Sequence, residues 1–347
     1  MRALVTGGAG FVGTNVADRL LRDGHEVVVL DNLSRDGVRD NLNWLRAHHR
    51  DRLTVVRGDV RDANVVGDAL HGVDQVFHFA AQVAVTTSVD DPRHDFAVNL
   101  AGTLNLLEEV RRRPTPPTLL FTSTNKVYGG LTDVAVGDIG GRYQPHDETW
   151  REHGISEARP LDFCSPYGCS KGGADQYVLD YAKSYGLRTV VFRMSCIYGH
   201  HQQGNEDQGW VAHFVKQAIA GEPITLYGDG RQVRDILYVD DLVEAMLTAM
   251  GRVDEFAGRA FNIGGGPDNT VSLLELLDMI GEQCGEAPEV SFSDWRIGDQ
   301  RWYVSDTRGF QRAAGWSPKV DVREGVQRLF LWLQSAAAPA LSVAESR

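Results

Sequence analysis

Residues 2–31 read RALVTGGAGFVGTNVADRLLRDGHEVVVLD, and this stretch decides the fold. A short run of strand-forming residues, 2–6, is followed by a glycine-rich turn and by an amphipathic segment that extends to Asp23. A second apolar run, 25–30, completes the stretch. Short apolar runs on either side of a helical pattern predict a strand, a helix and a second strand.

The glycines of the turn fit two related spacings. Gly8, Gly10 and Gly13 match G-x-G-x-x-G, and Gly7 replaces Gly8 in the wider G-x-x-G-x-x-G. Both spacings serve the same purpose, because a side chain would obstruct a sharp turn and the approach of a pyrophosphate to a helix N-terminus. A lone glycine match is weak evidence, but this one follows a strand and opens a helix. The sequence therefore predicts a dinucleotide-binding site.

The end of the second strand indicates which dinucleotide is bound. Asp31 lies about 20 residues beyond the glycines, where an acidic side chain can accept hydrogen bonds from the ribose hydroxyls. Its charge would repel a 2′-phosphate, which favours NAD over NADP. The NADP alternative stays open at this point, because an arginine such as Arg35 can accommodate that phosphate.

Strand and helix signals alternate through the first two thirds of the chain. Further strands are expected at 53–57, 74–79, 118–123 and 189–193, with helices from about Asp62, over 92–112 and around Tyr167. Alternation of this kind predicts an α/β fold, a Rossmann doubly wound parallel sheet covered by helices on both faces.

The pattern changes after residue 193. Helices are expected over 207–220, 239–250, 273–283 and 322–333, and strands over 224–227, 235–238 and 260–263. This part has no phosphate loop of its own, so we expect a smaller, discontinuous α/β substrate domain. We divide the chain into an NAD-binding domain 1–193 with returns around 236–250, a substrate domain 194–335 and a flexible tail 336–347.

Composition excludes several classes of partner. The chain has 347 residues, 42% of them hydrophobic, which is enough for a full core. A formal net charge of −12 argues against nucleic-acid and anionic-membrane surfaces, and no apolar run is long enough to span a membrane. The cysteines lack metal-ligand spacing and no signal peptide precedes the first strand, so we expect reduced thiols, no metal and a cytoplasmic protein. These cysteines are Cys164, Cys169, Cys196 and Cys284.

A second stretch, residues 163–180, carries candidate chemistry and reads FCSPYGCSKGGADQYVLD. Tyr167 precedes Lys171 by one helical turn, so the two side chains share one face. An ammonium beside a phenol favours the phenolate, and Tyr167 could then act as a base near neutrality. The plain alternative is a chance pair on a surface helix.

Ligands of such sheets bind at the carboxyl ends of the strands. The residues at these ends are Asp59, Val60, Phe79, Ala80, Ala81, Ser123, Thr124 and Ser195. The hydroxyl of Thr124 could bind a sugar oxygen and share a proton with Tyr167; the alternative is a threonine that satisfies a backbone group. The long, glycine-rich connection between these two residues predicts a lid over the substrate, around 129–141.

With these motifs in place, the chain resembles the extended short-chain dehydrogenase/reductase family, specifically its NAD-dependent nucleotide-sugar epimerases and dehydratases. The stretches that carry the resemblance are TGGAGFVG from Thr6, DNLS from Asp31, GDVRD from Gly58, FHFAAQ from Phe77, NLAGTLNLLE from Asn99, SPYGCSK from Ser165 and RQVRDILYVDDL from Arg231. Three stretches look most like the epimerases that act on carbon 2 of CDP-linked deoxyhexoses. They are TSTNKVYGG from Thr122, the run DFCSPYGCSKGGADQYVLDYAKSYGLRTVVFR from Asp162, and DQGWV from Asp207.

The resemblance implies a catalytic set of Thr124, Tyr167 and Lys171. The implied cofactor contacts, to which we add Ser34, Arg35, Ser123 and the catalytic pair Tyr167 and Lys171, are Gly7, Gly10, Phe11, Val12, Asp31, Asn32, Asp59, Val60, Phe79, Ala80, Ala81 and Asn99. Implied substrate contacts are Thr124, Lys126, Ser195, Gln208, Trp210, Val211, Arg234 and Arg301. The two arginines also have a physical case, because a nucleotide diphosphate needs guanidinium groups in an acidic protein.

The resulting hypothesis is an NAD-dependent epimerase of a CDP- or UDP-hexose, acting at carbon 2 by transient oxidation to a keto sugar. A 4-epimerase with the same catalytic residues is the nearest alternative, and a non-catalytic NAD-binding regulator is a third. Met194 and the segment 200–206 depart from the carbon-2 epimerases, which leaves the base and the sugar open. Dehydratase relatives carry an Asp-Glu pair where this chain has Asn125 and Lys126, so elimination lacks its proton carriers.

Relatives of this family are usually homodimers joined by the helices that follow Asn99 and Tyr167. These helices carry apolar residues on more than one face, which supports the same expectation here. The residues are Leu104, Leu107, Val110, Tyr177 and Tyr181.

Overall fold

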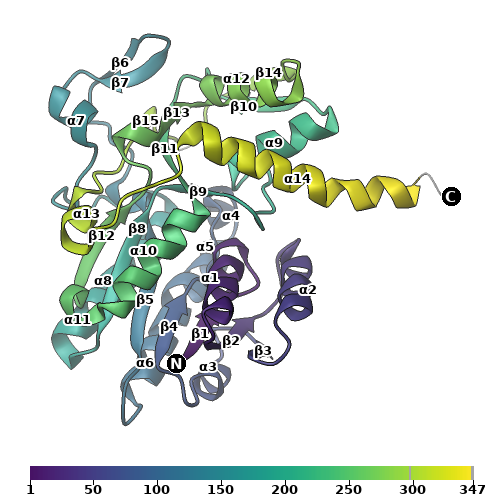
Figure 1. Cartoon of the computed structure of the whole chain (residues 1–347). Helices are drawn as coiled ribbons and strands as arrows, with labels where there is room; N and C mark the ends of the chain where they lie inside the picture. The colour runs from purple at the N-terminus through teal and green to yellow at the C-terminus, as the bar shows by residue number, and fades with distance from the viewer. Residues whose placement is uncertain (297, 345–347) are drawn as a thin grey trace.

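The computed structural model describes residues 1–296 and 298–344, with side chains described as far as residue 336 (Figure 1). Its centre is a seven-stranded parallel sheet with the strand order β12-β8-β5-β4-β1-β2-β3. The strands are β1 (Arg2–Thr6), β2 (Glu26–Asp31), β3 (Leu53–Arg57), β4 (Gln75–His78), β5 (Thr118–Thr124), β8 (Thr189–Met194) and β12 (Arg259–Ile263). The order reverses between β1 and β4, which is where a doubly wound sheet opens a ligand crevice. The predicted fold class is confirmed.

Helices cover both faces of this sheet because successive side chains of each strand point to opposite sides. Val5 and Phe77 belong to one apolar cluster, and their neighbours Leu4 and Val76 belong to another. The first cluster is covered by α1 (Phe11–Arg22) and α10 (Val239–Gly251), with α2 (Val38–His48) against α1. The second is covered by α3 (Ala63–Ala69), α6 (Gly102–Arg111) and α8 (Ser165–Tyr185).

The helix expected over 92–112 is divided. It consists of α5 (Pro92–Phe96), a π-helical turn η1 (Ala97–Ala101) and α6, and a short helix α4 (Val85–Asp90) precedes it. A π turn widens the helix by one residue and often marks a functional site.

Most of the remaining chain forms smaller sheets beside the carboxyl edge of the large one. β9 (Cys196–Tyr198), β13 (Thr270–Ser272) and β15 (Trp302–Tyr303) all pair with β11 (Val233–Tyr238), and β10 (Ile224–Tyr227) pairs with β14 (Val290–Ser293). The helices α9 (Trp210–Ala220), α12 (Leu273–Cys284) and α14 (Val322–Ala344) pack together around them (Figure 1). Shorter helices are α7 (Glu148–His153), α11 (Val253–Phe256), α13 (Arg308–Ala314) and the 3₁₀ turns η2 (Asn125–Tyr128) and η3 (Pro267–Asn269).

Three expectations about local structure were wrong. Helix α9 begins at Trp210 and not at 207, because Asn205 and Gln208 close a turn by mutual backbone hydrogen bonds and Gly209 is left-handed. Helix α14 continues to Ala344, past the expected end at residue 333, because alanine is a strong helix former; residues 345–347 of the expected tail lie outside the described part.

The third concerns the expected lid. Strands β6 (Val136–Ile139) and β7 (Arg142–Pro145) form a hairpin, and Arg142 and Tyr143 fix it to Glu275 and Asp229 of the smaller part. No residue of this hairpin lines the cavity described below. Gly140 and Gly141, with φ +69° and +84°, form the turn of this hairpin.

Candidate functional site

The glycine turn between β1 and α1 is built so tightly that side chains would not fit. Gly7 has φ +66°, and a Cβ there would lie 2.7 Å from the backbone nitrogen of Ala80 at the end of β4. A Cβ on Gly13 would lie 2.2 Å from the Gly7 carbonyl oxygen. Gly10 caps α1 and donates its backbone N–H to the Gly7 carbonyl. A Cβ on Gly8 would lie 2.8 Å from the Val5 carbonyl oxygen, and one on Gly10 3.1 Å from the Gly7 carbonyl oxygen, so both glycine spacings correspond to tight positions. The turn leaves the N-terminus of α1 open to an anion.

A cavity of about 790 Å³ lies over this turn, at the carboxyl ends of β1, β2, β4 and β5. Of the predicted cofactor residues, those that line it are Gly7, Gly10, Phe11, Val12, Asp31, Asn32, Ser34, Arg35, Asp59, Val60, Phe79, Ala80, Ala81, Ser123, Tyr167 and Lys171. They come from separate βα turns that the sheet brings to one edge. A cradle that a Cβ would fill, a helix N-terminus and a fixed carboxylate fit a dinucleotide such as NAD.

Asp31 is fixed for contact with a ribose. Its carboxylate accepts the backbone N–H groups of Ala9, at 3.0 Å, and Leu33, at 2.8 Å, and it is 9% exposed. Burial raises the pKa of this carboxyl, while the two backbone donors oppose that shift. The guanidinium of Arg35 donates to Gln208 on the opposite wall. The pairing of Asp31 with backbone donors and of Arg35 with Gln208 favours NAD over NADP.

Asp59 lies at the next strand end and is held by other side chains. Its carboxylate accepts hydrogen bonds from Arg61, at 2.8 and 2.9 Å, and from Asn32, at 2.9 Å. The Arg61 guanidinium holds the pKa of this carboxyl well below its usual range. Asp59 therefore presents a charged, oriented edge to the cavity.

Asn99 does not line the cavity, contrary to the sequence prediction. It is 1% exposed in the π turn, and its amide nitrogen donates to Asp95, Ser170 and the Gln82 carbonyl at 3.0 to 3.1 Å. Its amide oxygen accepts the Gln82 N–H at 2.9 Å. Asn99 thus fastens the cavity wall at Gln82 to α8 and does not face the cofactor space.

Of the predicted catalytic residues, Tyr167 and Lys171 line the cavity, whereas Thr124 follows the lining residue Ser123 and does not itself line it. Thr124 is the last residue of β5; its hydroxyl donates to the Asn125 amide oxygen at 3.3 Å and is near enough to the Tyr167 phenol to oppose the rise of that phenol's pKa. Tyr167 and Lys171 lie one turn apart on α8, and both line the cavity. A hydroxyl, a phenol and an amine beside a dinucleotide site form a constellation that can remove and return a proton.

The electrostatics of this group differ from the expectation. Burial raises the pKa of Tyr167 to about 12, although the nearby Thr124 hydroxyl opposes the shift. Burial also lowers the pKa of Lys171 to about 7, with Asp175 and Asp95 opposing it. The Lys171 ammonium lies 4.1 Å from the ring centre of Phe121. Lys171 therefore does not depress the pKa of the phenol in this structure, where desolvation is the largest influence.

The predicted substrate residues occupy several places. Gln208 lines the cavity; Lys126 donates to the Gly298 carbonyl at 3.3 Å; and Arg234 pairs with Asp299 at 2.6 Å. Arg301 lies over the rings of Tyr143 and Trp295, at 5.2 and 5.7 Å.

Three further predicted contacts have structural partners. Ser195 donates to Asp235, and the indole of Trp210 donates to the sulfur of Cys196. Val211 is 2% exposed and belongs to the core, so its prediction as a contact was wrong. It lies on the inner side of α9, where an apolar side chain packs instead of facing a polar substrate.

Several cavity residues were missed from the sequence. They are Gln82, Val83, Thr87, Asp207 and Lys216, whereas Gln203 and Asn205 belong to the segment 200–206 that the sequence had singled out. Most lie in irregular segments with no fixed spacing, so no motif marks them. Met194, noted as a departure, does line the cavity.

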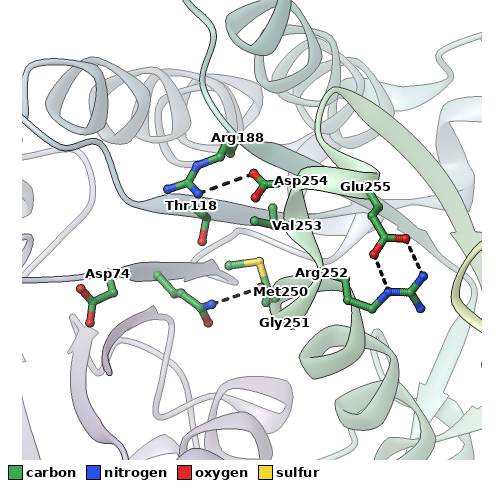
Figure 2. A pocket seen from close by; sticks show the side chains of 10 residues that line it. Asp74, Thr118, Arg188, Met250, Gly251, Arg252, Val253, Asp254 and Glu255 are labelled. Carbon is green, nitrogen blue, oxygen red and sulfur yellow. Dashed lines mark hydrogen bonds and ion pairs between the residues drawn. The ribbon is translucent and has the colours of Figure 1, made fainter.

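A second hollow, of about 450 Å³, lies at the opposite, amino edge of the sheet (Figure 2). Asp254 pairs with Arg188 across it at 3.6 Å, and Glu255 pairs with Arg252. These charges neutralise one another. Among the residues that the structure describes, no group of three His, Cys, Asp or Glu side chains could hold a metal ion, and no helix is long and apolar enough to cross a membrane. The four cysteines are free.

Comparison with known proteins identifies relatives along the whole chain. A family model described as the NAD dependent epimerase/dehydratase family matches residues 3–264. The chain is 43% identical over 342 residues to the CDP-paratose 2-epimerase of Salmonella typhi, covering 96% of this chain and 100% of that protein. It is 34% identical over 329 residues to the UDP-glucose 4-epimerase of Mycolicibacterium smegmatis, covering 94% and 97%. The crystal structure of the Thermus thermophilus UDP-glucose 4-epimerase in complex with NAD superimposes with a TM-score of 0.80 at 36% identity, covering 97% and 100%.

Proposed function

The chain belongs to the NAD dependent epimerase/dehydratase family, and we propose that it is an epimerase that inverts carbon 2 of a CDP-linked hexose. The observation that carries the proposal is the 43% identity to a CDP-paratose 2-epimerase over that protein's entire length. The 4-epimerase from Mycolicibacterium smegmatis matches at 34%. Similarity along both parts of the chain supports a shared substrate class as well as shared chemistry.

The geometry of the site supports an epimerisation in which the sugar carbon is first oxidised and then reduced from its opposite face. NAD bound over the glycine turn supplies a hydride acceptor, and its positive ring would oppose the desolvation that raises the pKa of Tyr167. Tyr167 takes the proton of the sugar hydroxyl, Thr124 orients that hydroxyl, and the Lys171 ammonium stabilises the phenolate. Once the keto sugar presents its other face, the Tyr167 phenol would return the proton to the sugar oxygen and bound NAD would supply the hydride to the carbon, which inverts it.

The residues after Thr124 support epimerisation over dehydration. Asn125 and Lys126 occupy η2, and the Lys126 backbone N–H donates to the Thr124 hydroxyl at 3.2 Å. Loss of water from the sugar needs an acid and a base at this place. An amide has no proton to exchange, and the single amine of Lys126 cannot supply both the acid and the base.

The test is product analysis with two nucleotide sugars. Purified protein without added NAD is incubated with a CDP-hexose and with the matching UDP-hexose, and NMR of the product identifies the inverted carbon. Tyr167→Phe removes the base and should lower kcat by about 10²–10⁴-fold, while the bound NAD content stays unchanged. Inversion at carbon 4 of the UDP sugar would establish the 4-epimerase in place of this proposal.

We propose the same two-part organisation that the sequence predicts, residues 1–193 for NAD and 194–335 for substrate. The return to the first part is larger than 236–250, because β12 completes the seven-stranded sheet. We propose a homodimer through the helices that follow Asn99 and Tyr167, α6 and α8. Exposed apolar side chains on α8 and on the neighbouring α4 and α5 support it: Tyr177 at 43%, Val89 at 52% and Phe96 at 55%.

Three other residues offered for this interface belong to the chain's own core: Leu107, Val110 and Tyr181. Sedimentation at micromolar concentration should give twice the chain mass, and a monomer would overturn the dimer. We also propose that the protein acts in the cytoplasm, where nucleotide sugars are made and thiols stay reduced.

A further inference from the structure

One wall of the cofactor cavity is an irregular segment that belongs to no helix or strand. Residues 200–208, which we call the strap, follow β9 and contribute the lining residues Gln203, Gly204, Asn205, Asp207 and Gln208. The strap meets the loop before α2, where the Arg35 guanidinium donates to Gln208. An added Cβ on Gly37 of this loop would lie 2.2 Å from the Gln203 Cγ. The strap and the loop therefore touch, and together they bound one side of the cavity.

Asn41 fastens the strap to the glycine turn. Its side-chain amide, on α2, donates to the His201 carbonyl at 3.0 Å and to the Ala9 carbonyl at 3.2 Å. Both acceptors are carbonyl oxygens, so the amide must present its nitrogen to them and uses both of its N–H groups. Asn41 is 4% exposed and does not line the cavity. It thus joins two walls of the site without facing the cofactor space.

The strap residue that Asn41 binds has an unfavourable backbone conformation. His201 has φ +66°, in the left-handed region that non-glycine residues rarely adopt. Its ring centre lies 4.3 Å from that of Trp44 on α2 and 5.4 Å from that of Trp332 on α14. Such a conformation persists only where the surroundings enforce it. Loss of the Asn41 hydrogen bond should therefore loosen the strap at its first turn.

A second asparagine repeats the arrangement one residue earlier in the strap. Asn15, on α1, donates to the His200 carbonyl at 3.0 Å and to the Phe11 carbonyl at 2.9 Å. It is 5% exposed and also lies outside the cavity lining. Further along the strap, the Arg296 guanidinium donates to the Glu206 carbonyl at 2.9 Å. The strap therefore connects the NAD-binding part with the smaller part of the chain.

We propose that Asn41 is a positioning residue for cofactor retention, which keeps the strap closed over bound NAD by fastening it to the glycine turn. Chemistry that takes a hydride from a sugar and returns it requires that the cofactor stay bound throughout. Opening of the strap is then the step that releases NAD, and the Asn41 hydrogen bonds set how often it occurs. The proposal rests on NAD binding and not on which sugar is epimerised.

The exchange of bound NAD measures this opening. Protein loaded with NAD is mixed with an excess of deuterated NAD, and native mass spectrometry follows the replacement of one by the other. Asn41→Ala is expected to exchange NAD about tenfold faster than the wild type, because two hydrogen bonds that hold the strap are lost.

The matched control is Asn269→Ala, which also removes a buried side-chain amide. Asn269 is 7% exposed, donates to the Val320 carbonyl at 3.4 Å and does not line the cavity. Its NAD exchange rate should stay at the wild-type value. An equal acceleration in Asn269→Ala and Asn41→Ala would show that lost stability, and not the strap, governs release, and would overturn the proposal.

Hydrogen exchange separates an open strap from a distorted glycine turn. Within the strap, the backbone N–H groups of Asn205 and Gln208 each donate to the other residue's carbonyl. In Asn41→Ala, peptides that cover 203–208 should exchange their amide hydrogens faster, while those that cover 7–14 stay protected. Faster NAD release without faster exchange in the strap would assign the effect to the turn and contradict the proposal.

Asn15→Ala provides a second route to the same result. It frees the His200 carbonyl but leaves the Asn41 contacts in place, so it should act in the same direction, and it replaces Asn41→Ala if that variant does not fold. An unchanged NAD exchange rate in Asn41→Ala, or in Asn15→Ala where it serves as the replacement, overturns the proposal. Faster exchange in a protein that epimerises no nucleotide sugar leaves the role of Asn41 in place and refutes the proposed function instead.

Discussion

Gly7→Ala is the most informative substitution in the glycine turn. It combines a strained backbone conformation with a steric clash, and a second glycine, Gly72, allows the two effects to be separated. Gly7 has φ +66°, and its added Cβ would lie 2.7 Å from the Ala80 nitrogen and 2.9 Å from the Phe79 carbonyl carbon. Gly72, in the turn before β4, has φ +68° and nothing within 4 Å of its added Cβ. Alanine at either position must adopt the left-handed conformation, but only at Gly7 does it also meet the backbone.

The left-handed conformation costs a non-glycine residue about 1–2 kcal/mol. Overpacking against backbone that cannot move freely adds about 1–3 kcal/mol. The free energy of unfolding should therefore fall by about 1–2 kcal/mol in Gly72→Ala and by about 2–5 kcal/mol in Gly7→Ala. Since Phe79 and Ala80 line the cavity, their displacement should also weaken NAD binding at least tenfold, or about 1.4 kcal/mol.

Urea unfolding followed by circular dichroism gives the first quantity, and calorimetric titration of NAD into stripped protein gives the second. Gly72→Ala should bind NAD as the wild type does. Equal destabilisation of the two variants, or unaltered NAD affinity in Gly7→Ala, would refute the reasoning that this turn cradles the cofactor.

Two further perturbations address the buried charges of α8. Burial lowers the pKa of Lys171 from its ordinary 10.5 to about 7. Between these two pH values the unfolded chain binds more protons than the folded chain. The free energy by which Lys171 destabilises the fold is therefore greatest below pH 7 and disappears toward pH 10.5. Lys171→Met should thus raise the free energy of unfolding by about 3 kcal/mol more at pH 6.5 than at pH 9.5, whereas Lys183→Met, exposed on the same helix, should show no such difference; equal gains at both pH values would contradict the assignment. Asp175→Asn strands the Arg193 guanidinium in the core and should cost about 3–5 kcal/mol in urea unfolding, and a loss below 1 kcal/mol would show that the pair is not buried as described.

The nucleotide-binding half of the molecule could be predicted from sequence because its signals are local. Gly7, Gly10 and Gly13 predict a tight turn in which larger residues would not fit. Asp31 lies at the end of the next strand, which the sequence marks by a continuous apolar run. The Tyr167–Lys171 pair could be found because helical periodicity fixes which residues share a face. In each case a few neighbouring residues determine the geometry.

The remaining parts depend on contacts between distant segments. Asn99 carries a motif, but its amide turns inward because the π turn at 97–101 brings it to Gln82 and Ser170. Lys216 reaches the cavity only because α9 packs beside it. The pKa of Tyr167 could not be predicted from the neighbouring lysine alone, because the extent of its burial is a property of the assembled fold.

The most direct test of the account follows one hydrogen atom. A CDP-hexose deuterated at carbon 2 is incubated with the purified protein in ordinary water without added NAD, and the product is examined by NMR. Inversion at carbon 2 with the deuterium retained on that carbon is the predicted result, since the hydride leaves and returns within one enclosed site. Loss of the label to solvent, or inversion at carbon 4 with carbon 2 untouched, would contradict it.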